Sequence, residues 1–291
     1  MEKKVGMCTG PSRMDDSAFI YNAWSGLRKV REDLDVKTTI IEAQDAKESS
    51  EHIAFLSEKD YDLIWVIGYD MLEPLEKAVD DFPGQKFAIV DAHPSKTSDN
   101  LISVNYREQE GAFLAGYIAA KSSQTGMIGF LGGKEVPVIQ KFQNGYTAGA
   151  KMANPDINIS VKWANSFISY ERGQVIGEDL YNEGCDIVFH AAGAVGKGLI
   201  RKASEMGKYV IGVDIDQTFL APQNVITSML KKVKKTIYQT TRDILDGGFD
   251  YPNSIELGIK EGMIDLTDIS IVADSQNLQA EIQEVKQKII N

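Results

Sequence analysis

Aromatic and acidic side chains stand at the ends of several predicted strands, where they could hold a small flat molecule. Asp91 ends one apolar run, Asp214 and Asp216 follow another, and Phe167 lies just behind a third. An aromatic face lets a flat ring stack, worth about 0.5–1.5 kcal/mol beyond burial, and a carboxylate accepts hydrogen bonds from a diol or a ring N–H. Together these residues indicate a binding site. Aspartates that cap helices and a phenylalanine of the core are the alternative interpretations.

The glycine-rich segments do not match catalytic motifs. The run from Gly193 to Gly198 resembles a Walker A loop, but Ala191 stands where the first glycine belongs, and Gly198 replaces the required Ser or Thr. No GxGxxG follows Thr9, which disfavours a dinucleotide-binding fold. Nucleotide hydrolysis and hydride transfer are therefore disfavoured, and we expect no cofactor. Gly193 keeps two interpretations, a close approach of the backbone to a ligand and a simple tight turn.

No base is paired with a nucleophile in the sequence. A GxSxG nucleophile elbow is missing, and the three histidines stand in unrelated contexts. His190 continues the apolar run 187–189, so we interpret it as a histidine of the core or its rim. We therefore expect a protein that is not an enzyme.

Short apolar runs alternate with amphipathic segments, which indicates βαβ units. The strands are rich in Val and Ile and mostly continuous, as expected for a parallel sheet with both faces buried. They are predicted at 5–9, 37–41, 63–68, 87–91, 127–131, 157–163, 186–191, 209–214 and 225–229. Helices are predicted at 17–32, 46–57, 71–81, 109–123, 136–153, 171–182, 195–206 and 232–245.

These strands are too many for one doubly wound domain, and the length of the chain suits two. The 291 residues allow two domains of about 100–200 residues each. The sequence therefore predicts two α/β lobes, each with a small parallel sheet. Ligands of such sheets bind outside the carboxyl ends of the strands. We expect the loops that follow the strands in the sequence to line one cleft between the lobes.

Composition and charge argue against nucleic acid as a partner. The chain is 43% apolar and 25% charged, with a net charge of −11, whereas phosphate binding needs a concentrated basic surface. Cys8 and Cys185 are expected to be buried free thiols, and no metal site is expected. No apolar run reaches the roughly 18–20 residues that span a bilayer. The first residues show no signal peptide, which leaves a cytoplasmic protein or a mature domain without its leader.

Several motifs, in order along residues 3–265, resemble those of a known family. They are Ala23-Trp24-Ser25-Gly26-Leu27, 110–116, Gly132-Gly133-Lys134-Glu135-Val136-Pro137-Val138, Asn154-Pro155-Asp156, Ala191-Ala192-Gly193, 210–217, Leu220-Ala221-Pro222, 227–231 and 258–262. On these residues the chain resembles the basic membrane protein family, substrate-binding lipoproteins of ABC importers best known as purine nucleoside receptors. The resemblance implies a type I periplasmic-binding-protein fold. In that fold two doubly wound α/β lobes, joined by a hinge, clamp a ligand without catalysis.

The resemblance also implies ligand-binding residues in both lobes: Asp16, Phe19, Asp91, Phe167, Gly193, Asp214 and Lys231. Phe19 and Phe167 correspond to the family's stacking aromatic residues. Asp214 corresponds to its ribose-binding aspartate and Lys231 to its ligand-contacting lysine. Asp16 matches the characteristic acid at the start of the family's first helix.

Two departures from the family lie on the base side of the expected ligand. The family often has Thr-Asp behind its first strand, where this chain has Thr9-Gly10-Pro11. It usually has Ser-Phe-Asn where this chain has Ala18-Phe19-Ile20. The resemblance is therefore closer on the ribose side than on the base side.

We expect the solute-binding component of an ABC importer, with a nucleoside as ligand, a purine nucleoside favoured, and a membrane permease as partner. The alternatives are the same fold with a free nucleobase, flavin or other flat heterocycle, and a cytoplasmic ligand-sensing regulator. The N-terminal lobe is expected at 1–106 and about 229–258, and the C-terminal lobe at 107–228 and about 259–291. We expect a monomer, anchored outside the cytoplasm as a lipoprotein, whose leader and anchoring cysteine are absent from this sequence.

Overall fold

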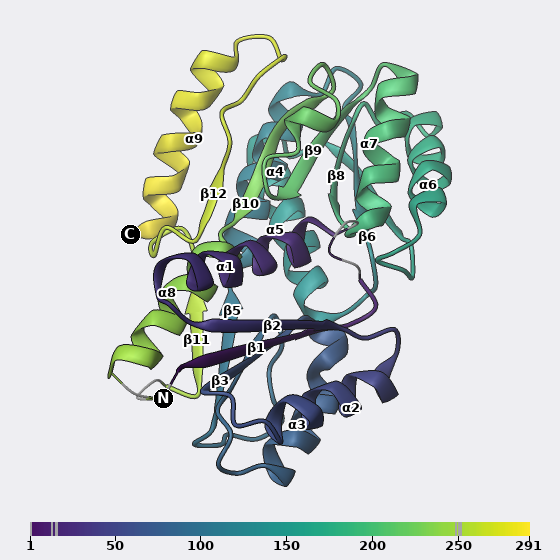
Figure 1. The fold of residues 1–291 in the computed structure, drawn as a ribbon. Helices are drawn as coiled ribbons and strands as arrows, with labels where there is room; N and C mark the ends of the chain where they lie inside the picture. The colour runs from purple at the N-terminus through teal and green to yellow at the C-terminus, as the bar shows by residue number, and fades with distance from the viewer. Residues whose placement is uncertain (1, 13, 15–16, 248, 250–251) are drawn as a thin grey trace. The chain divides into compact units, whose positions relative to one another are not determined.

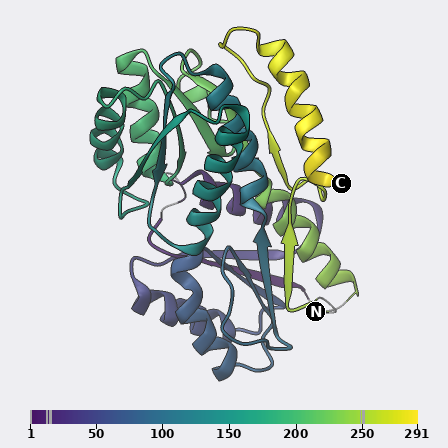
Figure 2. The ribbon, with the colours of Figure 1, turned by 180° about the vertical axis from the view of Figure 1, so that it is seen from behind.

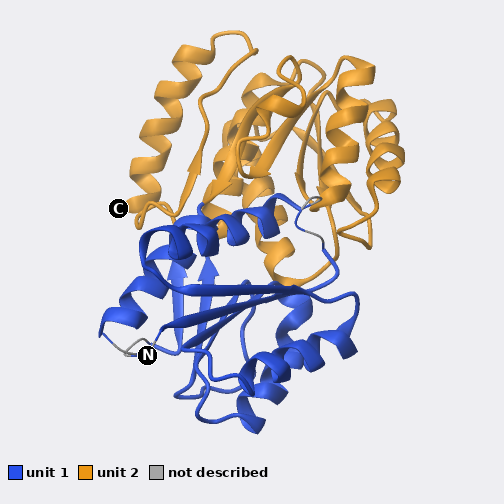
Figure 3. Cartoon of the chain, viewed as in Figure 1, with its two compact units in different colours: residues 1–106, 232–257 blue, residues 107–231, 258–291 orange. Residues whose placement is uncertain are grey.

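The chain divides into two compact units, which Figure 3 colours separately. A computed structural model describes residues 2–12, 14, 17–247, 249 and 252–291. Unit 1 comprises Met1–Tyr106 and Lys232–Leu257, and unit 2 comprises Arg107–Lys231 and Gly258–Asn291. The chain therefore passes from one unit to the other after Tyr106, after Lys231 and after Leu257.

Unit 1 is a parallel sheet with helices on both faces (Figure 1). In sheet order its strands are β11 (Ser254–Leu257), β5 (Leu101–Tyr106), β4 (Phe87–Val90), β3 (Leu63–Ile67), β1 (Lys4–Thr9) and β2 (Lys37–Glu42). Its helices are α1 (Ala18–Asp33), which packs with α8 (Val233–Gly247), and α2 (Ala46–Ser57), which packs with α3 (Leu72–Asp81). A 3-10 turn, η1 (Tyr69–Met71), precedes α3.

Unit 2 is built in the same way. In sheet order its strands are β12 (Ile264–Leu266), β10 (Val225–Lys231), β9 (Tyr209–Asp214), β8 (Ile187–Ala191), β6 (Met127–Gly132) and β7 (Asn158–Trp163). Its helices are α4 (Glu108–Ser122) with α5 (Pro137–Ala153), α6 (Tyr170–Asn182) with α7 (Ala194–Met206), and α9 (Ser275–Ile290) against α4 (Figure 2). A 3-10 turn, η2 (Thr218–Leu220), follows β9.

The two units repeat one strand order, so each strand of unit 1 has a counterpart in unit 2. β3 corresponds to β8, and β4 corresponds to β9. Asp91, directly behind β4, therefore corresponds to Asp214, the last residue of β9. The edge strands differ, because β11 runs parallel to β5 whereas β12 runs antiparallel to β10.

The central strands owe their place to continuous apolar sequence. Every residue of Leu63–Ile67 is buried, as a parallel strand covered on both faces requires. The indole N–H of Trp65 donates to Thr241 Oγ1 on α8 (2.8 Å), so this large ring is buried without an unsatisfied donor. In unit 2, Phe130 and Tyr146 pack with ring centroids 6.1 Å apart.

The expected α/β fold with two sheets is confirmed, but the sequence did not predict β5, β11, β12 or α9. In β5 two polar residues, Ser103 and Asn105, interrupt the continuous apolar pattern on which the other strands were predicted. Both are buried. Ser103 Oγ donates to the Ala92 carbonyl and Asn105 Nδ2 to Ser103 Oγ, each at 2.6 Å. Polar side chains satisfied in this way can occupy a buried strand at little cost.

Both cysteines are free and buried, as predicted. Cys8 lies on β1, and Cys185 lies just before β8. Burial raises the pKa of each thiol from 9.0 to about 12, because the charged thiolate is poorly solvated there. Across the part of the chain that the structure describes, no helix combines the length and the apolar character that crossing a membrane needs.

Candidate ligand-binding site

In unit 1 an aromatic ring and a glycine turn meet at the carboxyl edge of the sheet. Phe19 lies in the first turn of α1, where Ser17 Oγ caps the helix by accepting from the N–H of Ile20 (3.4 Å). The half-buried ring of Phe19 lies beside Gly68, directly behind β3. A Cβ atom on Gly68 would stand 3.8 Å from Phe19 Cε1. The φ of Gly68 is 101°, which L residues rarely adopt, so glycine is required for this turn.

Asp91 stands at the same edge of unit 1, directly behind β4. Its φ is 65°, a left-handed conformation that aspartate and asparagine tolerate better than most residues. The backbone N–H of Asp91 donates to the carbonyl of Val104 on β5 (3.0 Å), so the residue is still held by the sheet. Its side chain is half-buried. The other acid predicted for this region, Asp16, lies outside the described residues.

In unit 2 Phe167 and Gly193 are in direct contact at the carboxyl edge. The carbonyl of Phe167 accepts from the N–H of Ala194, the first residue of α7 (2.8 Å). Gly193 has a φ of 58°, and a Cβ there would stand 2.7 Å from that same carbonyl oxygen. Gly193 is therefore required both for its conformation and for its close approach to Phe167.

The ring of Phe167 is packed against a second glycine. A Cβ on Gly133 would stand 2.3 Å from Phe167 Cδ1, so this position also admits no side chain. The Nζ atom of Lys134 lies 5.7 Å from the ring centroid, within the range of a cation–π contact. The ring is half-buried and retains exposed surface.

Asp214 ends β9 in a tight turn. Its φ is 68°, and the N–H of Ile215 donates to the carbonyl of Val213 across it (2.8 Å). Asp216, two residues on, is exposed, and its carboxylate accepts from the N–H of Thr218 (2.9 Å). For Asp216 the capping interpretation is therefore the one that the structure supports. Asp214 remains as the half-buried acid of this edge.

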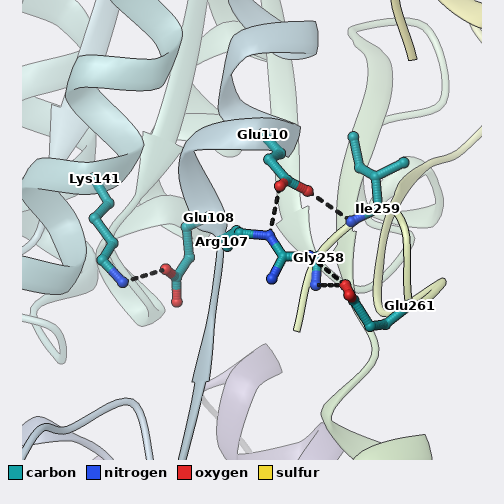
Figure 4. A network of polar contacts seen from close by, with 7 residues as sticks. All are labelled: Arg107, Glu108, Glu110, Lys141, Gly258, Ile259 and Glu261. Atoms are coloured by element: carbon teal, nitrogen blue, oxygen red, sulfur yellow. Dashed lines mark hydrogen bonds and ion pairs between the residues drawn. The ribbon is translucent and has the colours of Figure 1, made fainter. Parts of the chain in front are cut away.

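Lys231 differs from the other predicted residues because it is 1% exposed. Its Nζ lies 2.9 Å from Oε1 of Glu108, whose side chain is also 1% exposed. The Nζ of Lys141 lies 3.7 Å from Oε2 of the same carboxylate (Figure 4). A charge so deeply buried is tolerated when an opposite charge compensates it. Lys231 thus has a carboxylate partner inside unit 2, at the last residue before the chain enters unit 1.

A second ionic network starts at Arg107, the residue before Glu108 in the chain (Figure 4). Arg107, the first residue of unit 2, donates from Nε to Glu110 Oε1 (2.6 Å) and from Nη2 to the carboxylate of Glu261. Glu110 also accepts from the N–H of Ile259 (2.7 Å), and Glu261 from the N–H of Gly258 (2.8 Å). The residues that follow two of the passages between the units are therefore bound to one another inside unit 2.

At the two sheet edges the described residues offer aromatic ring faces and hydrogen-bond acceptors. Among the described residues no group of three or more His, Cys, Asp or Glu side chains could hold a metal ion. His190 is completely buried, which confirms its interpretation as a core histidine. Its burial lowers the pKa of the imidazole from 6.5 to about 4.

Comparison with known proteins identifies the family. The family model described as ABC transporter substrate-binding protein PnrA-like, Bmp, matches residues 3–291. The chain belongs to the Bmp family. Among relatives of this Bmp protein, basic membrane protein A of Borreliella burgdorferi is 40% identical over 284 residues, which are 95% of this chain and 83% of that protein. The expected family is therefore confirmed.

Solved structures give the same result for the fold. An ABC transporter solute-binding protein from Aeropyrum pernix K1 has a TM-score of 0.89 at 26% identity and covers 99% of this Bmp chain and 91% of its own. A transcriptional activator of the comK gene from Bacillus halodurans has a TM-score of 0.84 at 18% identity, covers 99% and 97%, and shares the fold. The periplasmic-binding fold is confirmed. The Bmp protein is a solute-binding component of an ABC transporter, a class with a small-molecule ligand and a membrane permease as partner.

One residue that the sequence did not single out follows Asp214 by three positions. Gln217 is 2% exposed, and its side-chain oxygen lies 3.0 Å from Nε2 of His190. The one signal for Gln217 was its place at the end of the motif 210–217, on which the family resemblance partly rested.

Proposed function

We propose that this Bmp-family protein binds a nucleoside, with a purine nucleoside favoured, and delivers it to an ABC permease. One observation carries the proposal. Each sheet edge offers the same three elements, a half-buried phenylalanine ring, a glycine with positive φ and a left-handed aspartate. They are Phe19, Gly68 and Asp91 in unit 1, and Phe167, Gly193 and Asp214 in unit 2.

These elements suit the parts of a nucleoside. The rings of Phe19 and Phe167 offer faces on which a purine or pyrimidine stacks. The carboxylate of Asp214 accepts hydrogen bonds from the vicinal ribose hydroxyls, and that of Asp91 accepts from an N–H or O–H group. Gly193 holds the loop that carries Phe167, and we assign it to the site on the family resemblance. We assign Asp16 and Lys231 to the same site on the family resemblance.

The rest of the proposed function follows from this class of protein. Binding proceeds without catalysis and without a cofactor, because the ligand is released unchanged to the permease. We propose that the protein works as a monomer outside the cytoplasm, attached to the membrane through a lipid.

Isothermal titration calorimetry of ligand-free protein tests the ligand. The probes are adenosine, guanosine, inosine and uridine, each beside its free base, with riboflavin as an unrelated flat heterocycle. We expect at least one nucleoside to bind about tenfold more tightly than its base, because the base lacks the ribose hydroxyls that would donate hydrogen bonds to Asp214. Equal affinity for nucleoside and base would reject the ribose assignment, and binding of none of the nucleosides would reject the proposed function.

A variant pair tests the stacking role. Phe167→Ala should weaken binding of the preferred nucleoside by about 1–3 kcal/mol, because it removes the ring face and its buried area. Phe219→Ala is the matched control, since Phe219 is a phenylalanine of unit 2 that is 68% exposed on η2. Its affinity should equal that of the wild type. If both variants bind alike, Phe167 does not stack on the ligand.

A further inference from the structure

In unit 2 the backbone pairing between β8 and β9 ends before it reaches Asp214. The parallel register between β8 and β9 ends at the pair Phe189 and Ile211, three residues before this aspartate. On its other side β9 remains paired, with Asp214 opposite Leu230 of β10. Val213 therefore lies where the β8 side of the ladder has ended.

The side chain of Gln217 lies where this pairing has ended. Its Oε1 accepts a hydrogen bond from the backbone N–H of Val213 (2.9 Å) and lies 3.0 Å from Nε2 of His190 on β8. A backbone N–H can only donate, so the atom facing it must be the amide oxygen. His190 must then donate through Nε2, which fixes the neutral tautomer with its proton on that nitrogen. The amide thus bridges β8 and β9 where backbone pairing has stopped.

The space for this bridge is fitted to the amide and the imidazole. A Cβ on Gly212 would stand 2.8 Å from Gln217 Oε1, and one on Gly196 would stand 2.1 Å from His190 Nδ1. The N–H of Gln217 donates to Ser228 Oγ on β10 (3.0 Å). Gln217, His190 and Ser228 are at most 2% exposed. Gln217 is therefore held by its side-chain oxygen at β8 and β9 and by its backbone N–H at β10.

The bridge ends at the turn that presents Asp214. Val213 donates its N–H to Gln217 and accepts from Ile215 across Asp214, so both polar groups of its backbone are occupied. A three-residue turn around a residue with φ of 68° is rare and strained. Such a conformation persists only where the surrounding structure holds it.

We propose that Gln217 and His190 are positioning residues for ligand binding, which hold Val213 so that Asp214 keeps its left-handed turn. The inference rests on the proposed function, because it takes Asp214 as the group that accepts the ribose hydroxyls. Gln217 replaces the missing backbone pairing, and His190 fixes the orientation of the Gln217 amide. Recognition of a riboside, as distinct from its free base, then depends on a buried amide that does not touch the ligand.

Three variants test this role. Gln217→Met keeps the shape of the side chain but removes the acceptor, and Gln217→Glu keeps an acceptor oxygen. Asn224→Leu is the matched control, because Asn224 is an amide of the same unit, directly before β10, whose Nδ2 donates to the carbonyl of Lys208 (2.8 Å). Each variant is titrated with guanosine, adenosine and inosine and with their free bases, and amide hydrogen exchange is measured at Val213.

Gln217→Met should lower the preference for nucleoside over base about tenfold and speed exchange of the Val213 amide about tenfold. Gln217→Glu should restore most of both, and Asn224→Leu should change neither, even where it lowers the unfolding midpoint. A wild-type preference in Gln217→Met overturns the inference. So does an equal loss of preference in Asn224→Leu, which would mark a general effect of stability. A wild-type protein that binds none of the nucleosides instead rejects the proposed function.

Discussion

The two units hold corresponding aspartates by different means. In unit 1 the pairing of β3 with β4 continues to Ile67 and Val90, and the N–H of Gly68 adds a bond to the Val90 carbonyl (3.1 Å). Asp91 follows directly. In unit 2 the pairing of β8 with β9 stops three residues before Asp214, and the amide of Gln217 takes its place. The backbone ladder therefore supports one aspartate, and a side chain supports the other.

The difference shows which half of the proposed site depends on residue identity. In β3 the position that corresponds to His190 is Val66, a buried apolar residue whose side chain does not titrate. A backbone ladder also survives most side-chain substitutions, because its donors and acceptors belong to every residue. The Gln217–His190 bridge in unit 2 is sensitive both to pH and to substitution, because it needs one side-chain amide and one neutral imidazole.

The largest contrast is expected at the two turn glycines. Gly193→Ala should lower the free energy of unfolding by about 4 kcal/mol, because a positive φ is combined with a Cβ only 2.7 Å from the Phe167 carbonyl. Gly68→Ala should cost about 2 kcal/mol, because it carries the conformational strain with only an ordinary contact at 3.8 Å. Urea unfolding followed by circular dichroism measures both. Equal losses would mean that the contact with Phe167 adds nothing.

Acid should weaken unit 2 through His190. The fold lowers the pKa of this imidazole from 6.5 to about 4, so between these values the unfolded chain binds the extra proton. The contribution of His190 to the free energy of unfolding is therefore complete above pH 6.5. It decreases as the pH is lowered, by about 3 kcal/mol at pH 4. Hydrogen exchange of the β8 and β9 amides against pH measures the loss.

The variant His190→Gln provides the control, since it cannot take up this proton. Its stability should be flat between pH 6.5 and 4.5. Below that range carboxylates such as Glu183, whose pKa its bond to Lys162 lowers from 4.5, begin to lose their partners in every variant. The same slope in wild type and His190→Gln would exclude His190 as its source.

The smallest contrast is expected at the aspartates themselves. Asp214→Asn should weaken nucleoside binding about tenfold, because the amide loses the charge and one of the two acceptor oxygens. Stability should be unchanged, since asparagine also tolerates a positive φ. Asp91→Asn should have a smaller effect, about threefold, since this acid is not assigned to the paired ribose hydroxyls. Asp216→Asn is the control, because its side-chain oxygen can still accept from Thr218. Calorimetry that ranks Asp91→Asn above Asp214→Asn would reverse the proposed roles.

The sequence was sufficient for the buried strands and for the residues at their ends. Continuous apolar runs such as Leu63–Ile67 predict a strand without further information, and a residue behind such a run must lie at an edge of the sheet. Asp91, Phe167 and Asp214 were found in this way, and the structure has all three behind or at the ends of their strands.

What the sequence could not predict depends on where strands separate or pack. Gln217 looks like an ordinary polar residue of a loop, because its role arises only where β8 and β9 stop pairing. The burial of Lys231 requires Glu108 from a helix more than a hundred residues earlier in the chain. The strand β5 was missed because Ser103 is satisfied by Ala92, a contact that only tertiary structure creates.

The two cysteines allow the unfolding of each unit to be followed separately by chemical labelling. Cys8 belongs to unit 1 and Cys185 to unit 2, and each thiol is fully buried with its pKa raised to about 12. Such a thiol is un-ionised at neutral pH and out of reach of an alkylating reagent while its unit stays folded. The rate of alkylation at each cysteine therefore measures how often that unit unfolds. A single unmodified chain can thus report the opening of its two halves separately, by mass spectrometry of two peptides.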